Sequence, residues 1–169
     1  MIHLYYGDGK GKTTAAMGLA LRMAGRGRGV VIAQFLKGAD SGERLALAPL
    51  PQVTLLPVPE QVKFTFQLTA EERRDEAARN QALLDRAARL ARDSNCGLVV
   101  LDEVCDAVNA GLLSLDALLA LLDSAKTEVV LTGRDPRPEL QARADYVTLF
   151  QKISHPFDRG NPARIGVEF

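Results

Sequence analysis

The chain has 169 residues, with 21 Lys and Arg against 21 Asp and Glu, two Cys and no Trp. This length is typical of one domain, so we expect residues 1–169 to form a single domain. Without net charge there is no long-range field to attract nucleic acid or an anionic membrane, and a bound anion must be recognised by local geometry. We therefore expect neither nucleic acid nor a membrane as a partner.

The two cysteines, Cys96 and Cys105, lie beside apolar stretches and show no CxxC motif or metal-ligand spacing. This pattern favours two buried thiols in a reducing compartment over a disulfide framework. The chain starts directly in a β-prone run, and no apolar stretch approaches the ~20 residues that a membrane helix needs. We expect a soluble, cytoplasmic protein.

Short β-prone runs alternate with helical patterns along the chain. We predict strands at residues 2–6, 30–35, 53–57, 98–102, 128–132 and 146–150, and helices at residues 13–24, 71–92 and 112–122. Several of these strands are almost wholly apolar, which indicates burial on both faces in a mostly parallel sheet. The alternation predicts a three-layer α/β domain whose ligand crevice lies at the carboxyl ends of the strands.

Local signals support two helix starts. Thr69 with Glu72 predicts a capping box, and Asp135 followed by Pro136 predicts an N-cap with proline at the first helical position. Two long segments, residues 57–68 and 151–169, do not fit the alternation. Segments of that length in a compact domain are usually functional or disordered.

A glycine-rich loop follows the first predicted strand and runs directly into the first predicted helix. Its residues are Gly7, Asp8, Gly9, Lys10, Gly11, Lys12, Thr13 and Thr14. Backbone N–H groups of such a loop converge on phosphate, Lys12 would reach the outer phosphates, and the Thr13 hydroxyl would bind Mg²⁺. We predict a nucleotide phosphate site; the alternative is a glycine-rich turn with two solvated lysines.

The loop departs from the Walker A pattern in one respect. The first glycine of that pattern would fall at Tyr6, whereas the glycine here is Gly7, one residue later. This shift suggests a nonstandard pose of the nucleotide.

A second motif is the apolar run at residues 98–101, which is followed directly by Asp102 and Glu103. Carboxylates at the same sheet edge as the loop can hold Mg²⁺, which neutralises phosphate charge. Alternatively, the two carboxylates cap a helix that begins at Val104. Arg22, nine residues after Thr13, could reach the nucleotide or be a solvated arginine at a helix end.

Five blocks in chain order resemble the P-loop type of corrinoid adenosyltransferase. They are the loop with Ala15-Ala16, Gln34-Phe35-Leu36-Lys37-Gly38 with Gly42-Glu43, Val99-Val100-Leu101-Asp102-Glu103, Leu131-Thr132-Gly133-Arg134, and a tail with His155-Pro156-Phe157-Asp158-Arg159-Gly160 and Gly166-Val167-Glu168-Phe169. The resemblance spans nearly the whole chain. It implies a P-loop NTPase-like, RecA-like domain.

The resemblance also implies the reaction. The family transfers the 5′-deoxyadenosyl group of ATP to the Co(I) of a reduced corrinoid and releases tripolyphosphate. It implies catalytic roles for Lys12, Thr13 and Glu103, a Mg²⁺ site at Thr13, Asp102 and Glu103, and ATP contacts from residues 7–14 and Arg22. A flavoprotein reductant and a homodimer are further expectations. The attacked atom would be ribose C5′, with ATP reversed relative to other P-loop proteins, which is compatible with the late glycine.

Phe64 and Phe66 match the aromatic positions with which the family is believed to displace the lower axial ligand of cobalt. Some relatives carry tryptophan at the second position. The alternative is an edge strand that packs both rings on the core. Two more departures are the start of the chain at the first strand, where some relatives have an N-terminal extension, and Ser154 where lysine is common. The next residue, His155, would either contact the site or only pack the tail.

Two other functions stay open from the sequence. One is a P-loop NTPase or kinase that acts at the γ-phosphate, with Arg134 as an arginine finger. The other is a non-catalytic protein that binds ATP and corrinoid. The first would yield orthophosphate in place of tripolyphosphate, and the second would form no Co–C product.

Overall fold

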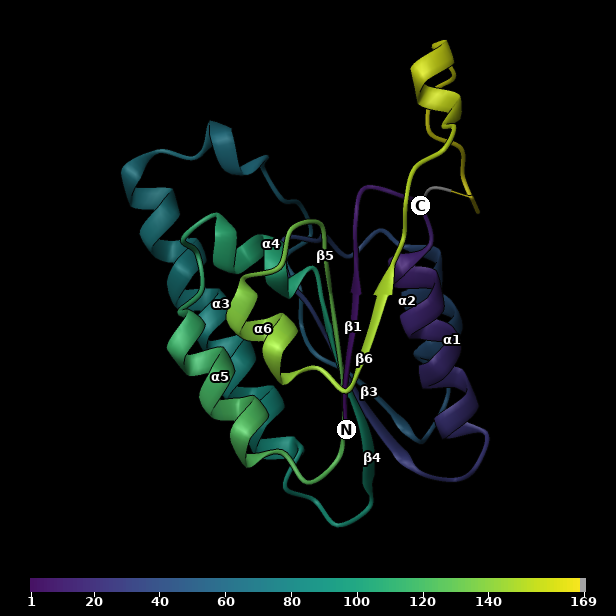
Figure 1. The fold of residues 1–169 in the computed structure, drawn as a ribbon, viewed down its shortest axis with the longest axis vertical. Helices are drawn as coiled ribbons and strands as arrows, with labels where there is room; N and C mark the ends of the chain where they lie inside the picture. Colours follow the sequence, from purple (N-terminus) through teal and green to yellow (C-terminus); the bar gives the residue numbers. More distant parts are fainter. Residues whose placement is uncertain (168–169) are drawn as a thin grey trace.

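The computed structural model describes residues 1–167 and shows a parallel sheet between two layers of helices (Figure 1). The sheet has the order β3-β2-β4-β5-β1-β6, and every neighbouring pair is parallel. The strands are β1 (Ile2–Tyr6), β2 (Gly29–Gln34), β3 (Val53–Leu55), β4 (Cys96–Asp102), β5 (Glu128–Gly133) and β6 (Tyr146–Leu149). The predicted three-layer α/β fold is confirmed, and each predicted strand is present.

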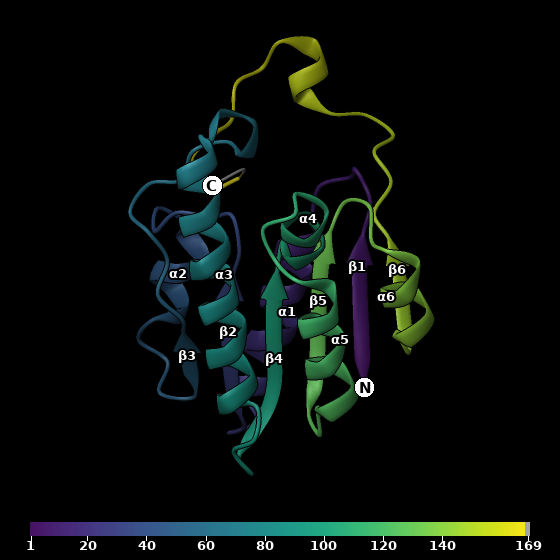
Figure 2. The ribbon, with the colours of Figure 1, turned by 90° about the vertical axis from the view of Figure 1, so that its left-hand side faces the viewer.

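The helices are divided between the two faces of the sheet. They are α1 (Lys12–Ala24), α2 (Gly42–Leu47), α3 (Ala70–Leu90), α4 (Val104–Asn109), α5 (Leu115–Ser124) and α6 (Pro138–Arg143), with short 3₁₀ turns η1 (Thr65–Gln67) and η2 (Pro156–Arg159). In Figures 1 and 2, α1 and α2 cover one face, and α3, α4, α5 and α6 cover the other.

The period of two along the strands explains why one sheet serves two cores. In β4, Val99 and Leu101 belong to the core beneath α3, α4 and α5, whereas Leu98 and Val100 belong to the core beneath α1. Successive strand residues point to opposite faces, so an uninterrupted apolar run fills both. All seven residues of β4 are buried.

The observed start of α3 agrees with the prediction from the sequence, whereas that of α5 differs from it. The capping box at α3 is confirmed, because the Thr69 side chain accepts from the backbone N–H of Glu72 and the Glu72 side chain accepts from that of Thr69. The predicted helix at residues 112–122 begins three residues late, since Ser114 provides an N-cap side chain. Leu112 and Leu113 are buried before the helix.

The predicted helix start at Asp135 and Pro136 is wrong. The helix α6 begins at Pro138, with Arg137 at the N-cap position. The backbone before it is held elsewhere, because the Asn109 side chain donates to the carbonyl of Asp135. The helix therefore starts at the second proline, Pro138, and not at Pro136. The six-residue helix α2 was not predicted, because it is too short to show a period. The equally short α4 was expected only in the alternative in which two carboxylates cap a helix beginning at Val104, and it does begin there.

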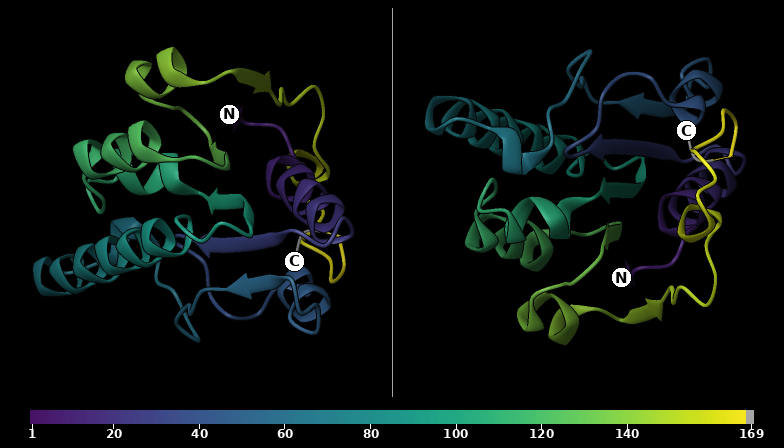
Figure 3. Two further views of the ribbon diagram at one scale, coloured as in Figure 1. Left: turned by 90° about the horizontal axis from the view of Figure 1, so that it is seen from below. Right: turned by 90° about the horizontal axis from the view of Figure 1, so that it is seen from above.

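The tail after β6 crosses the end of the sheet at which the parallel strands terminate. Figure 3 shows it running from β6 past α1 toward α2, with η2 along the way. Lys10 in the glycine-rich loop donates a hydrogen bond to the carbonyl of Val167. The tail, which is the second of the two segments that did not fit the alternation, thus lies over the predicted ligand crevice.

Both cysteines are free and buried, as predicted. Burial, together with the nearby Asp106 carboxylate, raises the pKa of the Cys105 thiol to about 12, so this thiol stays protonated at neutral pH. Within residues 1–167, no helix combines the length and the apolar character needed to cross a membrane.

Gly133→Ala tests the packing of α4 on the end of β5. An added Cβ would lie 2.4 Å from the Cβ of Cys105, so the substitution should lower the free energy of unfolding by about 1–3 kcal/mol in urea titrations. Gly18→Ala is the matched control, because its Cβ would meet nothing within 4 Å and alanine favours the helix. Equal stability of Gly133→Ala and the unsubstituted protein would contradict the packing.

Candidate active site

The glycine-rich loop connects β1 to α1 and is fixed at two points. The Gly7 N–H donates to the carbonyls of Gly133 (3.2 Å), at the end of β5, and Arg134 (3.1 Å), just after it, and the Gly9 N–H donates to the carbonyl of Phe150 (2.7 Å), just after β6. The loop therefore depends on the strands on both sides of β1. Its remaining N–H groups lie at the start of α1, where the helix dipole favours an anion.

The position of the first glycine follows from this packing. Gly7 has φ +116°, and a Cβ there would lie 2.4 Å from the carbonyl oxygen of Phe150. Tyr6 is still part of β1, and its ring packs against the core. The left-handed turn, and with it the need for glycine, therefore comes one residue later than in the Walker A pattern.

Lys12, the lysine of the loop, lies folded back on its own backbone. Its Nζ donates to the carbonyls of Gly7 (2.6 Å) and Gly9 (2.8 Å). Burial, followed by the positive charge of Arg134, lowers the pKa of Lys12. An anion bound inside the loop would reverse the effect of Arg134 and give the ammonium a charged partner in place of two carbonyls.

The carboxylate of Asp102, at the end of β4, is fully buried and accepts four hydrogen bonds. Its Oδ1 accepts from the hydroxyls of Thr13 (2.9 Å) and Thr132 (2.7 Å), and its Oδ2 accepts from Lys37 (2.7 Å) and Gln34 (3.3 Å). Four donors from four different parts of the fold compensate the desolvation of this charge.

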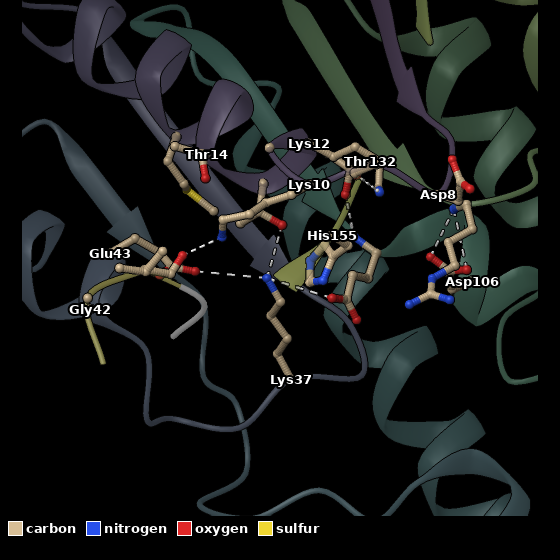
Figure 4. Close-up of a pocket in the computed structure, with 18 of the residues that line it drawn as sticks. Asp8, Lys10, Lys12, Thr14, Lys37, Gly42, Glu43, Asp106, Thr132 and His155 are labelled. Atoms are coloured by element: carbon tan, nitrogen blue, oxygen red, sulfur yellow. Dashed lines mark hydrogen bonds and ion pairs between the residues drawn. The ribbon is translucent and has the colours of Figure 1, made fainter. Parts of the chain in front are cut away.

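The ammonium of Lys37 lies at the centre of the site, where dashed lines converge in Figure 4. Its Nζ is 2.7 Å from Asp102, 3.1 Å from the Thr13 hydroxyl, 3.7 Å from Glu103 and 3.9 Å from Glu43. Burial alone would lower the pKa of Lys37, but the carboxylates, Asp102 above all, outweigh burial and raise it. Lys37 is therefore a partly buried cation surrounded by oxygen atoms.

Glu103 connects β4 to α4 in a left-handed conformation with φ +59°, which is rare for a residue with a side chain. Its backbone N–H donates to the Thr132 hydroxyl (2.7 Å), which holds the turn. Glu103 occupies the N-cap position of α4, but its side chain makes no capping hydrogen bond. The alternative that this carboxylate caps the next helix is wrong, and its side chain faces the cavity instead.

A cavity of about 830 Å³ lies above these groups at the carboxyl edge of the sheet. Its lining unites most of the predicted site residues: Asp8, Gly9, Lys10, Gly11, Lys12, Thr13, Thr14 and Glu103. The tail contributes His155, Gly166 and Val167. His155 also caps η2, since its Nδ1 accepts from the Phe157 N–H.

Arg22 does not join this group. It lies exposed in the last turn of α1, at the opposite end of the helix from Thr13, and it does not line the cavity. Nine residues of α-helix extend about 14 Å, which separates it from the loop. The interpretation of Arg22 as a solvated arginine at a helix end fits this position, and the ATP contact does not.

Phe64 and Phe66 lie outside the cavity, on the turn η1 that precedes α3. The alternative that they form an edge strand packed on the core is wrong, because the rings are 70% and 81% exposed. The two rings stack on each other with centroids 5.5 Å apart. Arg73 supports the turn by donating to the carbonyls of Thr65 and Ala110. Figure 1 shows this turn at the same end of the molecule as the tail.

Several residues of the site were not predicted to have a role there. Lys37, Glu43, Asp106 and Thr132 line the cavity. Arg134, which the sequence suggested only as an arginine finger of the alternative enzyme acting at the γ-phosphate, lines it as well. They belong to, or adjoin, the blocks that carry the family resemblance, and this is the signal that could have identified them. Burial raises the pKa of Asp106, and the backbone N–H of Arg134 donates to its carboxylate (3.2 Å).

A glycine-rich loop after β1 that faces a buried carboxylate at the end of β4 and a half-buried one just after it defines a P-loop nucleotide-binding protein. The crystal structure of the RadB recombinase has the same fold, with a TM-score of 0.50 over 91% of this chain and 76% of that chain, at 19% identity. This likeness concerns the fold alone, and it agrees with the RecA-like domain expected from the sequence.

The family follows from sequence comparison. The model of the family described as ATP:corrinoid adenosyltransferase BtuR/CobO/CobP matches residues 1–169. The corrinoid adenosyltransferase of Pseudomonas aeruginosa is 37% identical over 98% of this chain and 82% of its own length. That of Escherichia coli strain K12 is 34% identical, covering 100% of this chain and 85% of its own length. The chain belongs to the ATP:corrinoid adenosyltransferase family and is a transferase.

Glu103 should make the stability of the free protein depend on pH. Burial raises the pKa of Glu103 from 4.5 to about 7, although Lys37 partly opposes the shift. The folded state therefore holds this proton more tightly than the unfolded state, so the contribution is complete below about pH 4.5 and is lost as pH rises through 7. Because the side chain is 35% exposed, screening reduces the loss to about 1–2 kcal/mol.

Glu103→Gln should remove the part of the pH dependence of stability that comes from Glu103. Urea titrations at pH 5 and pH 8 should show that the free energy of unfolding of the variant falls less between the two pH values than that of the unsubstituted protein. Parallel pH profiles of the two proteins would show that Glu103 titrates normally.

Proposed function

We propose that this protein transfers the 5′-deoxyadenosyl group of ATP to the Co(I) of a reduced corrinoid and releases tripolyphosphate. One observation carries the proposal. The blocks that distinguish the family from other P-loop proteins contribute Lys37, Thr132, Arg134 and His155 to the same cavity as the phosphate loop. An ordinary phosphate loop would need none of these blocks to bind a nucleotide.

The site suits a reaction in which the whole triphosphate leaves. The electron pair of Co(I) in the substrate forms the new Co–C bond at C5′, and the electrons of the broken C5′–O bond depart with the triphosphate. Charge then grows along the phosphate chain, where the loop N–H groups, Lys10 and Lys12 lie. Lys12 would exchange its two loop carbonyls for phosphate oxygens.

The residues also fit a divalent cation of the Mg²⁺ type. The oxygen atoms of Thr13, Asp102 and Glu103 already gather around one positive charge, that of Lys37. Within residues 1–167, no three His, Cys, Asp or Glu side chains form a metal cluster, so phosphate oxygens would complete the coordination. When bound with ATP, Mg²⁺ would neutralise part of the charge on the triphosphate.

No proton has to be removed from Co(I) or from C5′, so the reaction requires no general base. The demand on the protein is to align Co(I) with C5′ and to exclude competing reactions. We assign alignment of the corrinoid to Phe64 and Phe66, whose stacked, exposed rings are an unusual apolar feature for a surface. A single electron from a reductant of the flavoprotein class would convert Co(II) to Co(I) beforehand.

Two further expectations are part of the proposal. The free, buried thiols support a reducing, cytoplasmic location. The edge strand β6 exposes Tyr146, Val147 and Leu149, which supports contact with a second copy in a homodimer.

The reaction products test the proposal. Incubation with ATP, Mg²⁺ and chemically reduced corrinoid should give a light-sensitive Co–C compound and tripolyphosphate in equal amounts. Lys12→Ala should lower the rate at least about a hundredfold without unfolding, because it removes a charge that stabilises the leaving group. Lys126→Ala, which removes an exposed lysine before β5, should retain the rate of the unsubstituted enzyme.

The other outcomes have definite meanings. Orthophosphate in place of tripolyphosphate would assign the site to attack at the γ-phosphate. Binding of ATP and corrinoid without the Co–C product would contradict transfer. Activity of Lys12→Ala within about tenfold of the unsubstituted enzyme would contradict the role of the loop.

Phe64→Ala should affect the two oxidation states of the substrate differently. If the aromatic pair displaces the lower axial ligand, the variant should lose little activity with reduced cob(I)alamin and most of it with cob(II)alamin plus a reductase. The rates of Co–C formation in the two assays measure this difference. Equal losses in both would assign Phe64 to packing of the turn.

A further inference from the structure

The position of Lys37 raises a question of charge, since its ammonium lies where the proposed function needs a metal. The Thr13 hydroxyl and the Asp102 carboxylate, two of the groups that fit Mg²⁺, both contact the Nζ of Lys37, at 3.1 Å and 2.7 Å. The third group, Glu103, is 3.7 Å away. Two cations cannot share one set of oxygen atoms at such distances, because their repulsion is strong in a partly buried site.

The backbone directs Lys37 into this position. The preceding residue, Leu36, has φ +54°, a left-handed conformation that costs free energy for a residue with a side chain. On the other side of Leu36, β2 ends in Gln34, which is buried and contacts Asp102 and Glu43 through its amide nitrogen. The chain thus reverses sharply after β2 and returns Lys37 to the end of β4.

The surrounding carboxylates explain why a positive charge is needed at this position when no ligand is bound. Asp102 is fully buried, and the nearby Glu43 and Glu103 are only partly exposed. Three carboxylates close together would repel one another if no positive charge lay between them. Lys12 does not supply it, because its ammonium is bound to carbonyls within the loop.

We propose that Lys37 is an internal cation that occupies the divalent-metal position of the nucleotide-free enzyme and is exchanged for the metal when ATP binds. This inference rests on the proposed function, because it concerns the same ATP site. The displaced ammonium would gain the triphosphate as a new partner, so its charge stays compensated. The metal then enters with the nucleotide, since metal alone would leave Lys37 without a counterion.

The exchange makes opposite predictions for metal and for nucleotide. With Mn²⁺ as the probe and no nucleotide, electron paramagnetic resonance titration should show Lys37→Met binding about tenfold or more tighter than the unsubstituted enzyme, because the competing cation is gone. ATP with EDTA, measured by calorimetry, should bind about tenfold or more weakly to the variant, because the triphosphate loses a partner. Lys126→Met, which removes one exposed charge elsewhere, should change neither affinity.

A role of Lys37 in stability alone would weaken the binding of both probes. Weaker or unchanged Mn²⁺ binding by folded Lys37→Met therefore overturns the inference. If Lys37→Met does not fold, Lys37→Gln, which is also neutral but keeps a donor for Asp102, is subject to the same two measurements and the same criterion.

These measurements use no corrinoid, so they separate the inference from the proposed function. If Mn²⁺ affinity is unchanged in the variant while the unsubstituted enzyme forms the Co–C product, only the inference is wrong. If the affinities change in opposite directions and no Co–C product forms, the exchange is supported and the proposed transfer is wrong.

Discussion

The buried carboxylate of Asp102 connects the parts of the site more than any other group. Its four donors come from the start of α1, the end of β2, the turn after β2 and the end of β5. A charge taken out of water must be compensated by such partners, or it destabilises the fold. The phosphate loop, the carboxyl edge of the sheet and Lys37 are therefore held in one arrangement by one side chain.

Two strained residues lie next to this carboxylate. Leu36 and Glu103 are the non-glycine residues with positive φ in the part of the chain that the structure describes, and each flanks a group of the site. Such conformations persist where the surrounding contacts outweigh their cost, and they cluster at functional sites. Here one turn returns Lys37 to β4, and the other directs the Glu103 side chain toward the cavity. The strain thus accounts for the position of both the cation and the carboxylate that faces it.

Much of the fold could be predicted from the sequence because its signals are local. The apolar runs gave strands such as β4, and Thr69 with Glu72 gave the start of α3. The site was harder, because long-range packing determines it. No pattern in the sequence places Lys37 beside Asp102, the tail over the cavity, or Arg22 away from it. The first glycine of the loop is likewise needed at position 7, and not at position 6, because of the carbonyl of Phe150, which is remote in sequence and close in space.

In the proposed exchange, an internal cation and an external cation occupy one position beside Asp102 in turn. A crystal structure with Mn²⁺ and a nonhydrolysable ATP analogue tests it most directly, because the anomalous signal locates the metal. We expect Mn²⁺ within about 2.5 Å of the Thr13 hydroxyl, with the Lys37 ammonium moved from Asp102 to the triphosphate. Mn²⁺ bound elsewhere on the nucleotide, with Lys37 still paired to Asp102, would contradict it.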